Sequence, residues 1–106
     1  MKTFGSILSE VRRAKGLSQK ELASRVTKED GQAISAQYLN DIEHDRRNPP
    51  SEYLIGQIAD VLAESKDFLC LAAGTIPDDL RSLATTQPEK AQAAFKAFRI
   101  AVKDSK

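Results

Sequence analysis

The sequence predicts an all-α chain of five short helices followed by a short helical C-terminal extension. Apolar residues recur three or four positions apart, and almost no stretch alternates apolar with polar residues as strands do. Serines, glycines and prolines divide the chain into segments of helical length. With 106 residues, of which 41% are hydrophobic and 29% charged, the chain has the size and composition of one soluble domain with an appendage.

Capping residues place the first two helices. The first can begin at Thr3 or Ser6 and should end before Gly16, which suits the left-handed position after a helix. The second follows Ser18, because Glu21 stands three residues later and the two form a capping box. Both segments then space their apolar residues as on one face of a helix.

Three further serines can cap the third, fourth and fifth helices: Ser35, Ser51 and Ser65. The third helix is expected over residues 36–44. The prolines at 49–50 cannot stand inside a helix, so they place a loop before the fourth. We therefore predict a five-helix domain over residues 1–74.

The extension is predicted over residues 75–106. Pro77 suits the first position of a short helix and Pro88 that of a longer one. The longer helix carries an apolar stripe, in which Phe95, Phe98 and Val102 form a possible dimer interface. The stripe either pairs with a second chain or packs on the core of its own chain.

Several classes of site are excluded by composition. The single Cys70 excludes a disulfide framework, and with the single His44 it excludes clustered zinc ligands, so no metal or cofactor is expected. We interpret Cys70 as a buried small side chain rather than a redox sensor, and His44 as a helix-end residue rather than a pH switch. No membrane span or signal peptide is expected, and the predicted location is cytoplasmic.

Three motifs follow one another along the first half of the chain. They are Val11-Arg12-Arg13-Ala14-Lys15-Gly16-Leu17-Ser18-Gln19-Lys20-Glu21-Leu22-Ala23, then Ile34-Ser35-Ala36-Gln37-Tyr38-Leu39-Asn40-Asp41-Ile42-Glu43, then Arg46-Arg47-Asn48-Pro49-Pro50. They resemble the Cro/CI-type (XRE) helix-turn-helix family of phage and bacterial repressors, over roughly residues 4–74. The resemblance implies a lambda-repressor-like domain that binds double-stranded DNA.

In this family the N-terminal half of the third helix lies in the major groove. Burial of Leu39 and Ile42 would turn four candidate base contacts outward: Ala36, Gln37, Asn40 and Asp41. Gln37 and Asn40 carry amides that match an adenine edge, Ala36 can touch a thymine methyl, and Asp41 can accept from a cytosine amine. Asp41 equally suits a local ion-pair or capping role, because its carboxylate repels phosphate.

Candidate backbone contacts surround this helix: Ser18, Gln19, Lys28, Ser35, Arg46, Arg47 and Asn48. The resemblance implies that Gln19 reaches the DNA backbone from a helix N-terminus, where free N–H groups favour phosphate. Without that context, Arg46 and Arg47 would be ordinary surface charges. The resemblance also implies a structural ion pair between Arg12 and Glu43, which would be costly to break if buried and worth little if exposed.

The turn between the second and third helices departs from the family. It contains about six extra residues, within 28–33. The insertion either extends the second helix or loops away from the duplex. Lys28 would add a phosphate contact there, whereas Glu29 and Asp30 would oppose one.

The leading hypothesis is a sequence-specific DNA-binding transcriptional regulator and repressor of bacterial or phage origin, acting at the nucleoid. It would bind a palindromic operator as a homodimer. The alternative is an antitoxin-like or adaptor protein that binds a protein partner through residues 75–106, which the net charge of only +1 favours. No enzyme is expected, because no nucleophile–base pair, glycine-rich phosphate loop or metal-ligand cluster stands in the sequence.

Overall fold

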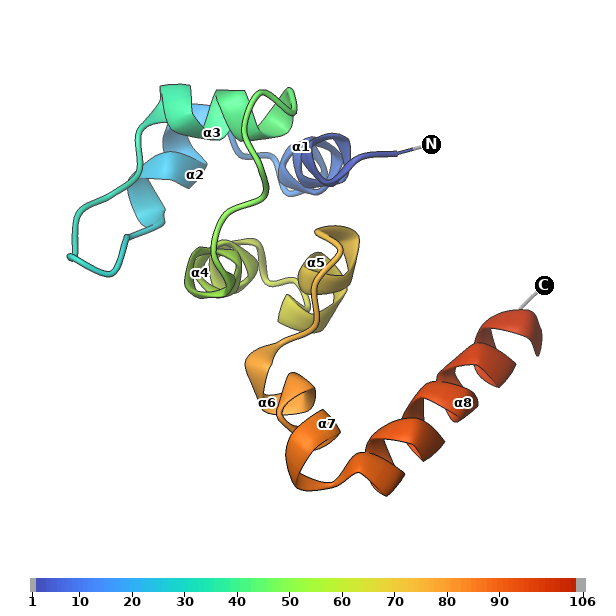
Figure 1. Cartoon of the computed structure of the whole chain (residues 1–106). Helices are drawn as coiled ribbons and strands as arrows, with labels where there is room; N and C mark the ends of the chain where they lie inside the picture. Colours follow the sequence, from blue (N-terminus) through green and yellow to red (C-terminus); the bar gives the residue numbers. More distant parts are fainter. Residues whose placement is uncertain (1, 105–106) are drawn as a thin grey trace. The chain divides into compact units, whose positions relative to one another are not determined.

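The structure is a computed structural model that describes residues 2–104 (Figure 1). Its helices are α1 (Phe4–Ala14), α2 (Gln19–Arg25), α3 (Ala36–Glu43), α4 (Glu52–Leu62), α5 (Lys66–Ala72), α6 (Asp78–Arg81), α7 (Leu83–Thr86) and α8 (Pro88–Asp104). Within these residues the only β pairing is one isolated bridge, between Thr27 and Ala33, so the all-α prediction is confirmed. No helix of the described part is long and apolar enough to cross a membrane.

The chain divides into two compact units, Met1–Thr75 and Ile76–Lys106. The first unit contains α1 to α5, and the second contains α6 to α8.

Hydroxyl caps begin all the helices of the first unit. The side-chain oxygens of Thr3, Ser18, Ser35, Ser51 and Ser65 each accept a hydrogen bond from the backbone N–H three residues later. Thr3, rather than Ser6, caps α1, and the Ser6 hydroxyl oxygen accepts from the N–H of Thr3 in return. Since one such cap contributes about 1 kcal/mol, the local sequence sets where these helices start.

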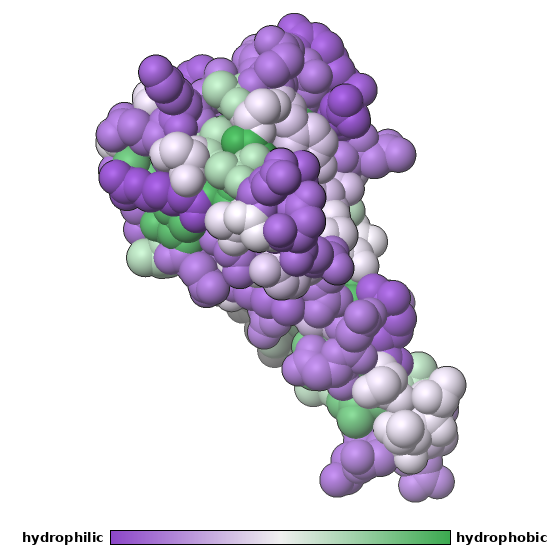
Figure 2. Space-filling model, turned by 90° about the vertical axis from the view of Figure 1, so that its left-hand side faces the viewer, coloured by the Kyte–Doolittle hydropathy of each residue, from purple (hydrophilic) through white to green (hydrophobic). Residues whose placement is uncertain are grey.

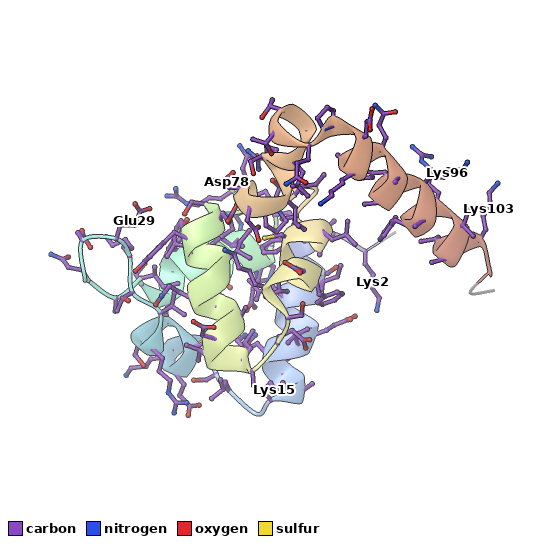
Figure 3. The ribbon with its side chains drawn as sticks, turned by 90° about the horizontal axis from the view of Figure 1, so that it is seen from below. Lys2, Lys15, Glu29, Asp78, Lys96 and Lys103 are labelled. Carbon is purple, nitrogen blue, oxygen red and sulfur yellow. The ribbon has the colours of Figure 1, made fainter. Side chains whose placement is uncertain are left out.

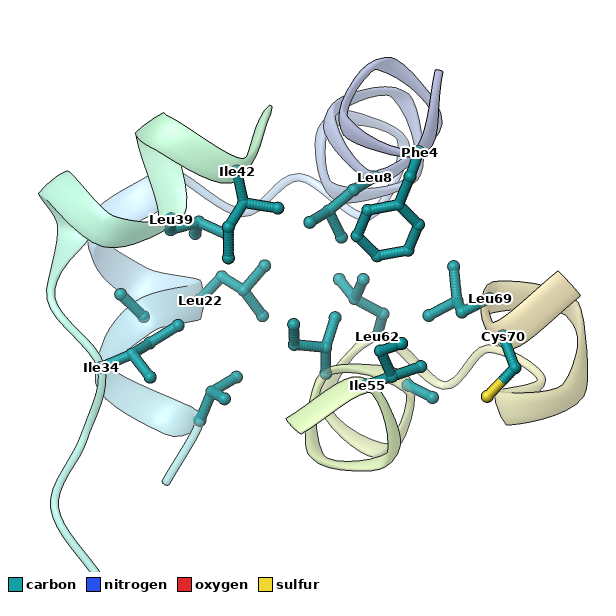
Figure 4. Packing of buried hydrophobic residues seen from close by; sticks show 14 residues of the cluster. Phe4, Leu8, Leu22, Ile34, Leu39, Ile42, Ile55, Leu62, Leu69 and Cys70 are labelled. Carbon is teal, nitrogen blue, oxygen red and sulfur yellow. The ribbon is translucent and has the colours of Figure 1, made fainter. Parts of the chain in front are cut away.

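Side chains from α1 to α5 and from the segment before α3 meet in one hydrophobic core (Figure 4). Its buried members are Phe4, Leu8, Leu22, Ala23, Val26, Ile34, Leu39, Ile42, Ile55, Ile58, Ala59, Leu62, Leu69 and Cys70. Within this core α3 packs against both α2 and α1, while α5 packs against α4 and α1. Burial raises the pKa of the Cys70 thiol, which is the state expected of an inert, structural cysteine.

The start of α1 lies directly against the end of α3. A Cβ atom on Gly5 would stand 2.6 Å from the carbonyl oxygen of Glu43 and would also meet that of Ile42. Asp45 adopts a left-handed backbone conformation with a φ of 59°. Its carboxylate accepts from the N–H of Gly5 at 3.2 Å and from the hydroxyl of Thr3 at 2.7 Å. The glycine and the aspartate together fix the approach of the two helices.

The second unit differs in one detail from the sequence prediction. One short helix is expected after Pro77, whereas the structure has two single turns, α6 and α7, separated at Ser82. The carbonyl oxygen of Ser82 accepts from the N–H groups of Thr85 and Thr86, so the chain begins a new turn there. Apolar side chains of this unit line a small pocket of about 130 Å³: Ile76, Leu80, Leu83, Ala91, Ala94, Phe95 and Phe98.

Candidate nucleic-acid interface

Two capped helices, α2 and α3, pack against each other and present one polar face. Leu39 and Ile42 of α3 are buried, and so is Ala23 of α2, whose small side chain suits a close helix crossing. Ala36 and Gln37 are therefore exposed at the N-terminal end of α3, and Asn40 and Asp41 are partly exposed one turn later. The side of the first unit seen in Figure 2 is mainly hydrophilic, with hydrophobic residues confined to small patches.

A buried ion pair joins α1 to α3. The guanidinium of Arg12 donates from Nε to Glu43 Oε2 at 2.6 Å and from Nη2 to Glu43 Oε1 at 2.9 Å. Its Nη1 donates to the carbonyl oxygen of Leu17 at 2.8 Å, which ties the pair to the residue before the α2 cap. The side chains are only 8% and 2% exposed. The pair thus sets the position of α3 relative to both preceding helices.

Gln19 extends this network toward the surface. Its amide nitrogen donates to Glu43 Oε1 at 2.9 Å and to Asn40 Oδ1 at 3.1 Å. Burial disfavours the charged form of Glu43, but the hydrogen bonds from Arg12 and Gln19 outweigh it and keep the pKa of its carboxyl below the usual range. The same pairing raises the pKa of Arg12. Gln19 and Asn40, both candidate DNA contacts, are therefore oriented by a charged pair that lies beneath them.

A second cluster surrounds Asp41 on the outer side of α3. Asp41 Oδ1 accepts from the side-chain amide of Gln37 at 3.0 Å and from Arg46 Nη1 at 3.2 Å. Arg47 Nε lies 3.8 Å from Asp41 Oδ2, and its guanidinium stands 5.1 Å from the ring centre of Tyr38. The structure thus brings one candidate base contact and two candidate backbone contacts together on a single carboxylate.

The other candidate backbone contacts are spread along the edge of the two helices. The hydroxyl oxygens of Ser18 and Ser35 accept from the N–H groups of Glu21 and Tyr38, which leaves each hydroxyl proton able to donate. Asn48 is exposed in the loop after α3. Ser18 and Ser35 thus stand at the starts of α2 and α3, and Asn48 follows the end of α3.

The insertion between α2 and α3 forms a small hairpin. The N–H of Ile34 donates to the carbonyl of Val26 at 3.0 Å, and that of Lys28 to Gln32 at 2.8 Å. Helix α2 ends at Arg25, so the extra residues do not extend it. In Figure 3 the labelled Glu29 lies at the outer end of this loop. Lys28 stands near the carboxylate of Asp30, at 3.9 Å, which offsets its charge.

The candidate dimer residues lie on α8 in the second unit. Phe95, Phe98 and Val102 are each about half exposed, at 52%, 51% and 53%. Phe95 and Phe98 also line the apolar pocket of this unit. Basic side chains accompany them on α8, where Lys96 and Lys103 project from the helix (Figure 3).

Two contributors to the site are not predicted from the sequence. Asp45, which precedes Arg46, owes its role to a left-handed backbone and to its hydrogen bonds with Thr3 and Gly5 at the start of α1. Gly5 resembles any glycine near a helix start until α3 is placed against it. Both depend on contacts between residues some forty positions apart, and no local pattern signals such contacts.

Comparison with known proteins identifies the family. A family model described as helix-turn-helix matches residues 8–69, which include α2, α3 and the network beneath them. Neither the curated proteins nor the solved structures gave a significant match to the chain. The matched segment covers more than half of the chain and contains all three motifs noted in the sequence. The chain belongs to the Cro/CI-type (XRE) family of helix-turn-helix proteins and is a DNA-binding transcription regulator.

Proposed function

We propose that this regulator is a sequence-specific repressor, and that it reads the major groove of a palindromic operator with α3 as a homodimer. The observation that supports this most directly is the composition of the outer face of α3. Gln37 and Asn40 carry amides there that can bind a base edge in two places at once. Arg46 and Arg47 follow on an exposed loop at the end of the helix, where they can hold phosphates.

The braced position of α3 further supports base reading. A recognition helix discriminates between sequences only if its side chains keep a fixed register against the groove. The pair Arg12–Glu43 and the amide of Gln19 supply that register from beneath. Solvent-exposed polar residues on an unbraced helix would offer no such selectivity.

Two sets of substitutions should weaken DNA binding in different ways. Replacing Arg46 and Arg47 with alanine should weaken binding to all duplexes alike and lower the salt slope by about 0.9 for each phosphate that the variant no longer neutralises. Replacing Gln37 with alanine should cost roughly 1–3 kcal/mol on the selected operator alone. Fluorescence anisotropy over a salt series, with a duplex selected from a random pool and with the pool itself, measures both effects.

A double substitution in the second unit provides the charge-matched control. Lys90→Ala with Lys96→Ala removes the same charge from α8 and should leave the salt slope nearly unchanged. If wild-type affinity did not depend on salt, or if Gln37→Ala weakened every duplex equally, base reading by α3 would be wrong.

In the proposed complex, dimerisation through α8 brings a second copy of α3 to the other half-site of the operator. A single small module buries too little DNA surface for high selectivity, whereas a dimer places two α3 helices one helical turn apart, about 34 Å. The half-exposed stripe of Phe95, Phe98 and Val102 is the apolar surface that a second copy would cover.

Phe98→Asp should convert the dimer to a monomer, because it places a charge in that stripe. Ile100→Asp is the matched control, since Ile100 is equally exposed, at 51%, but points to another side of the helix. Light scattering gives the mass, and circular dichroism checks that α8 remains helical. A wild-type chain that is monomeric alone and forms a stoichiometric complex with another protein would favour the antitoxin-like or adaptor function instead.

A further inference from the structure

Asp41 is an acidic residue in direct contact with candidate DNA contacts on the outer side of α3. Both of its carboxylate oxygens face side chains proposed to bind DNA: Oδ1 faces Gln37 and Arg46, and Oδ2 faces Arg47. The carboxylate is one-fifth exposed, whereas both arginine side chains are more than half exposed. The carboxylate is therefore more enclosed than the two guanidinium groups with which it pairs.

This arrangement does not suit a residue that reads a base. A carboxylate that accepts from a cytosine amine needs an oxygen directed into the groove, but here Oδ1 already accepts two hydrogen bonds from the chain itself and Oδ2 lies 3.8 Å from Nε of Arg47. It also carries the sign of charge that phosphate repels. A carboxylate so placed lowers the attraction of the arginine loop for any DNA backbone.

We propose that Asp41 is a specificity-determining residue that suppresses binding to arbitrary DNA. The inference rests on the proposed base reading by α3. On a duplex of arbitrary sequence, Arg46 and Arg47 can contact phosphates only by weakening their pairing with Asp41. On the operator, the base contacts of Gln37 and Asn40 compensate for that loss.

The geometry indicates why this effect concerns binding rather than folding. The guanidinium groups of Arg46 and Arg47 are more than half exposed, so water screens their pairing with Asp41, and such surface pairs contribute little to stability. Asp41 also stands in the last turn of α3, where a negative charge is unfavourable to the helix dipole. Removal of its charge should therefore leave the fold intact.

Asp41→Asn is the decisive variant, because asparagine keeps the size of the side chain and can still accept from Gln37. We expect it to bind a random-sequence duplex about three- to fivefold more tightly at low salt, the change expected when exposed ion pairs no longer compete. The salt slope should steepen by about 0.9, since one more net positive charge faces the phosphates. The ratio of operator to random affinity should fall.

Two controls separate this role from others. Asp60→Asn removes the same charge from an exposed position on α4 and should change neither affinity nor salt slope. Asp41→Asn combined with Arg46→Ala and Arg47→Ala should show no gain over the two arginine substitutions alone, because the effect acts through those side chains. Asp41→Glu retains the charge and should retain the low random-sequence affinity.

The outcomes are distinguishable. If Asp41→Asn weakened binding to the operator alone, Asp41 would be a base contact. If it weakened binding to every duplex, Asp41 would instead position the two arginines. Either result overturns this inference and leaves the proposed function intact. A wild-type chain that binds no duplex at low salt would overturn the proposed function and the inference together.

Discussion

Glu43→Ala is expected to lower the free energy of unfolding by about 3–5 kcal/mol, because it leaves the guanidinium of Arg12 buried without its carboxylate. Both residues are 6% exposed, so water cannot replace the lost pairing. The Gln19 amide and the Leu17 carbonyl remain near the site, but neither carries a compensating charge. Urea unfolding followed by circular dichroism measures the loss.

An exposed ion pair between Glu10 of α1 and Lys2, which precedes the helix, serves as the control. Lys2 and Glu10 lie 2.9 Å apart with side chains 66% and 59% exposed, so Glu10→Ala should cost less than about 1 kcal/mol. Equal losses for Glu10→Ala and Glu43→Ala would mean that the buried pair is no more important than a surface one.

The same pair should make stability depend on pH. The folded-state pKa of Glu43 lies below its ordinary value of 4.5, so its contribution is complete above that value and disappears as the pH falls through the folded-state pKa. The wild-type chain should therefore lose stability in acid. Glu43→Gln should be less stable at neutral pH and should show a flatter profile below the ordinary carboxyl pKa.

Gly5→Ala should be the second most damaging of these substitutions, with a loss of about 3 kcal/mol. The added methyl would overlap the backbone oxygens of Ile42 and Glu43 and the Asp45 carboxylate, because it would stand closer to each than van der Waals contact allows. Helices α1 and α3 must therefore separate. The separation also strains the nearby pair of Arg12 and Glu43. Thermal unfolding measures the loss, and anisotropy on the operator shows whether α3 has moved.

Gly56 in α4 provides a matched comparison. A Cβ there would meet only the flexible side chain of Lys66, at 3.6 Å, which is an ordinary contact. Gly56→Ala should therefore stabilise the chain by up to about 1 kcal/mol, because alanine is the better helix former. A stabilising Gly5→Ala would contradict the close approach of α1 to α3.

Local sequence signals predict much of this fold. Hydroxyl residues followed by apolar periodicity predict the starts of α2 to α5, and the structure has them there. The cap is a hydrogen bond between two residues only three positions apart, so both partners can be recognised in the local sequence. The hairpin of the insertion is not predicted, because it is held by one isolated bridge and a few backbone hydrogen bonds. A polar segment with one glycine does not reveal such pairing.

Fewer contacts of the candidate site can be predicted from local sequence. The outward position of Gln37 follows from the burial of Leu39 and Ile42, which helical spacing predicts. The contact of Asp41 with Gln37 also follows from helical spacing, because the two residues lie four positions apart on α3. Its contacts with Arg46 and Arg47 do not follow, because they depend on how the loop after α3 turns back at Asp45. Gln19 likewise contacts Glu43 beneath it only because α2 and α3 cross closely.

The buried cysteine has a practical consequence. Cys70 is the chain's one thiol, it lies on α5 within the core, and burial raises its pKa. A thiol reagent can modify it only during transient opening of α5, so the modification rate reports the population of opened molecules. A ligand that binds only the closed form lowers that population in proportion to its saturation. The rate of modification in the presence and absence of duplex thus gauges DNA affinity without a label on the DNA.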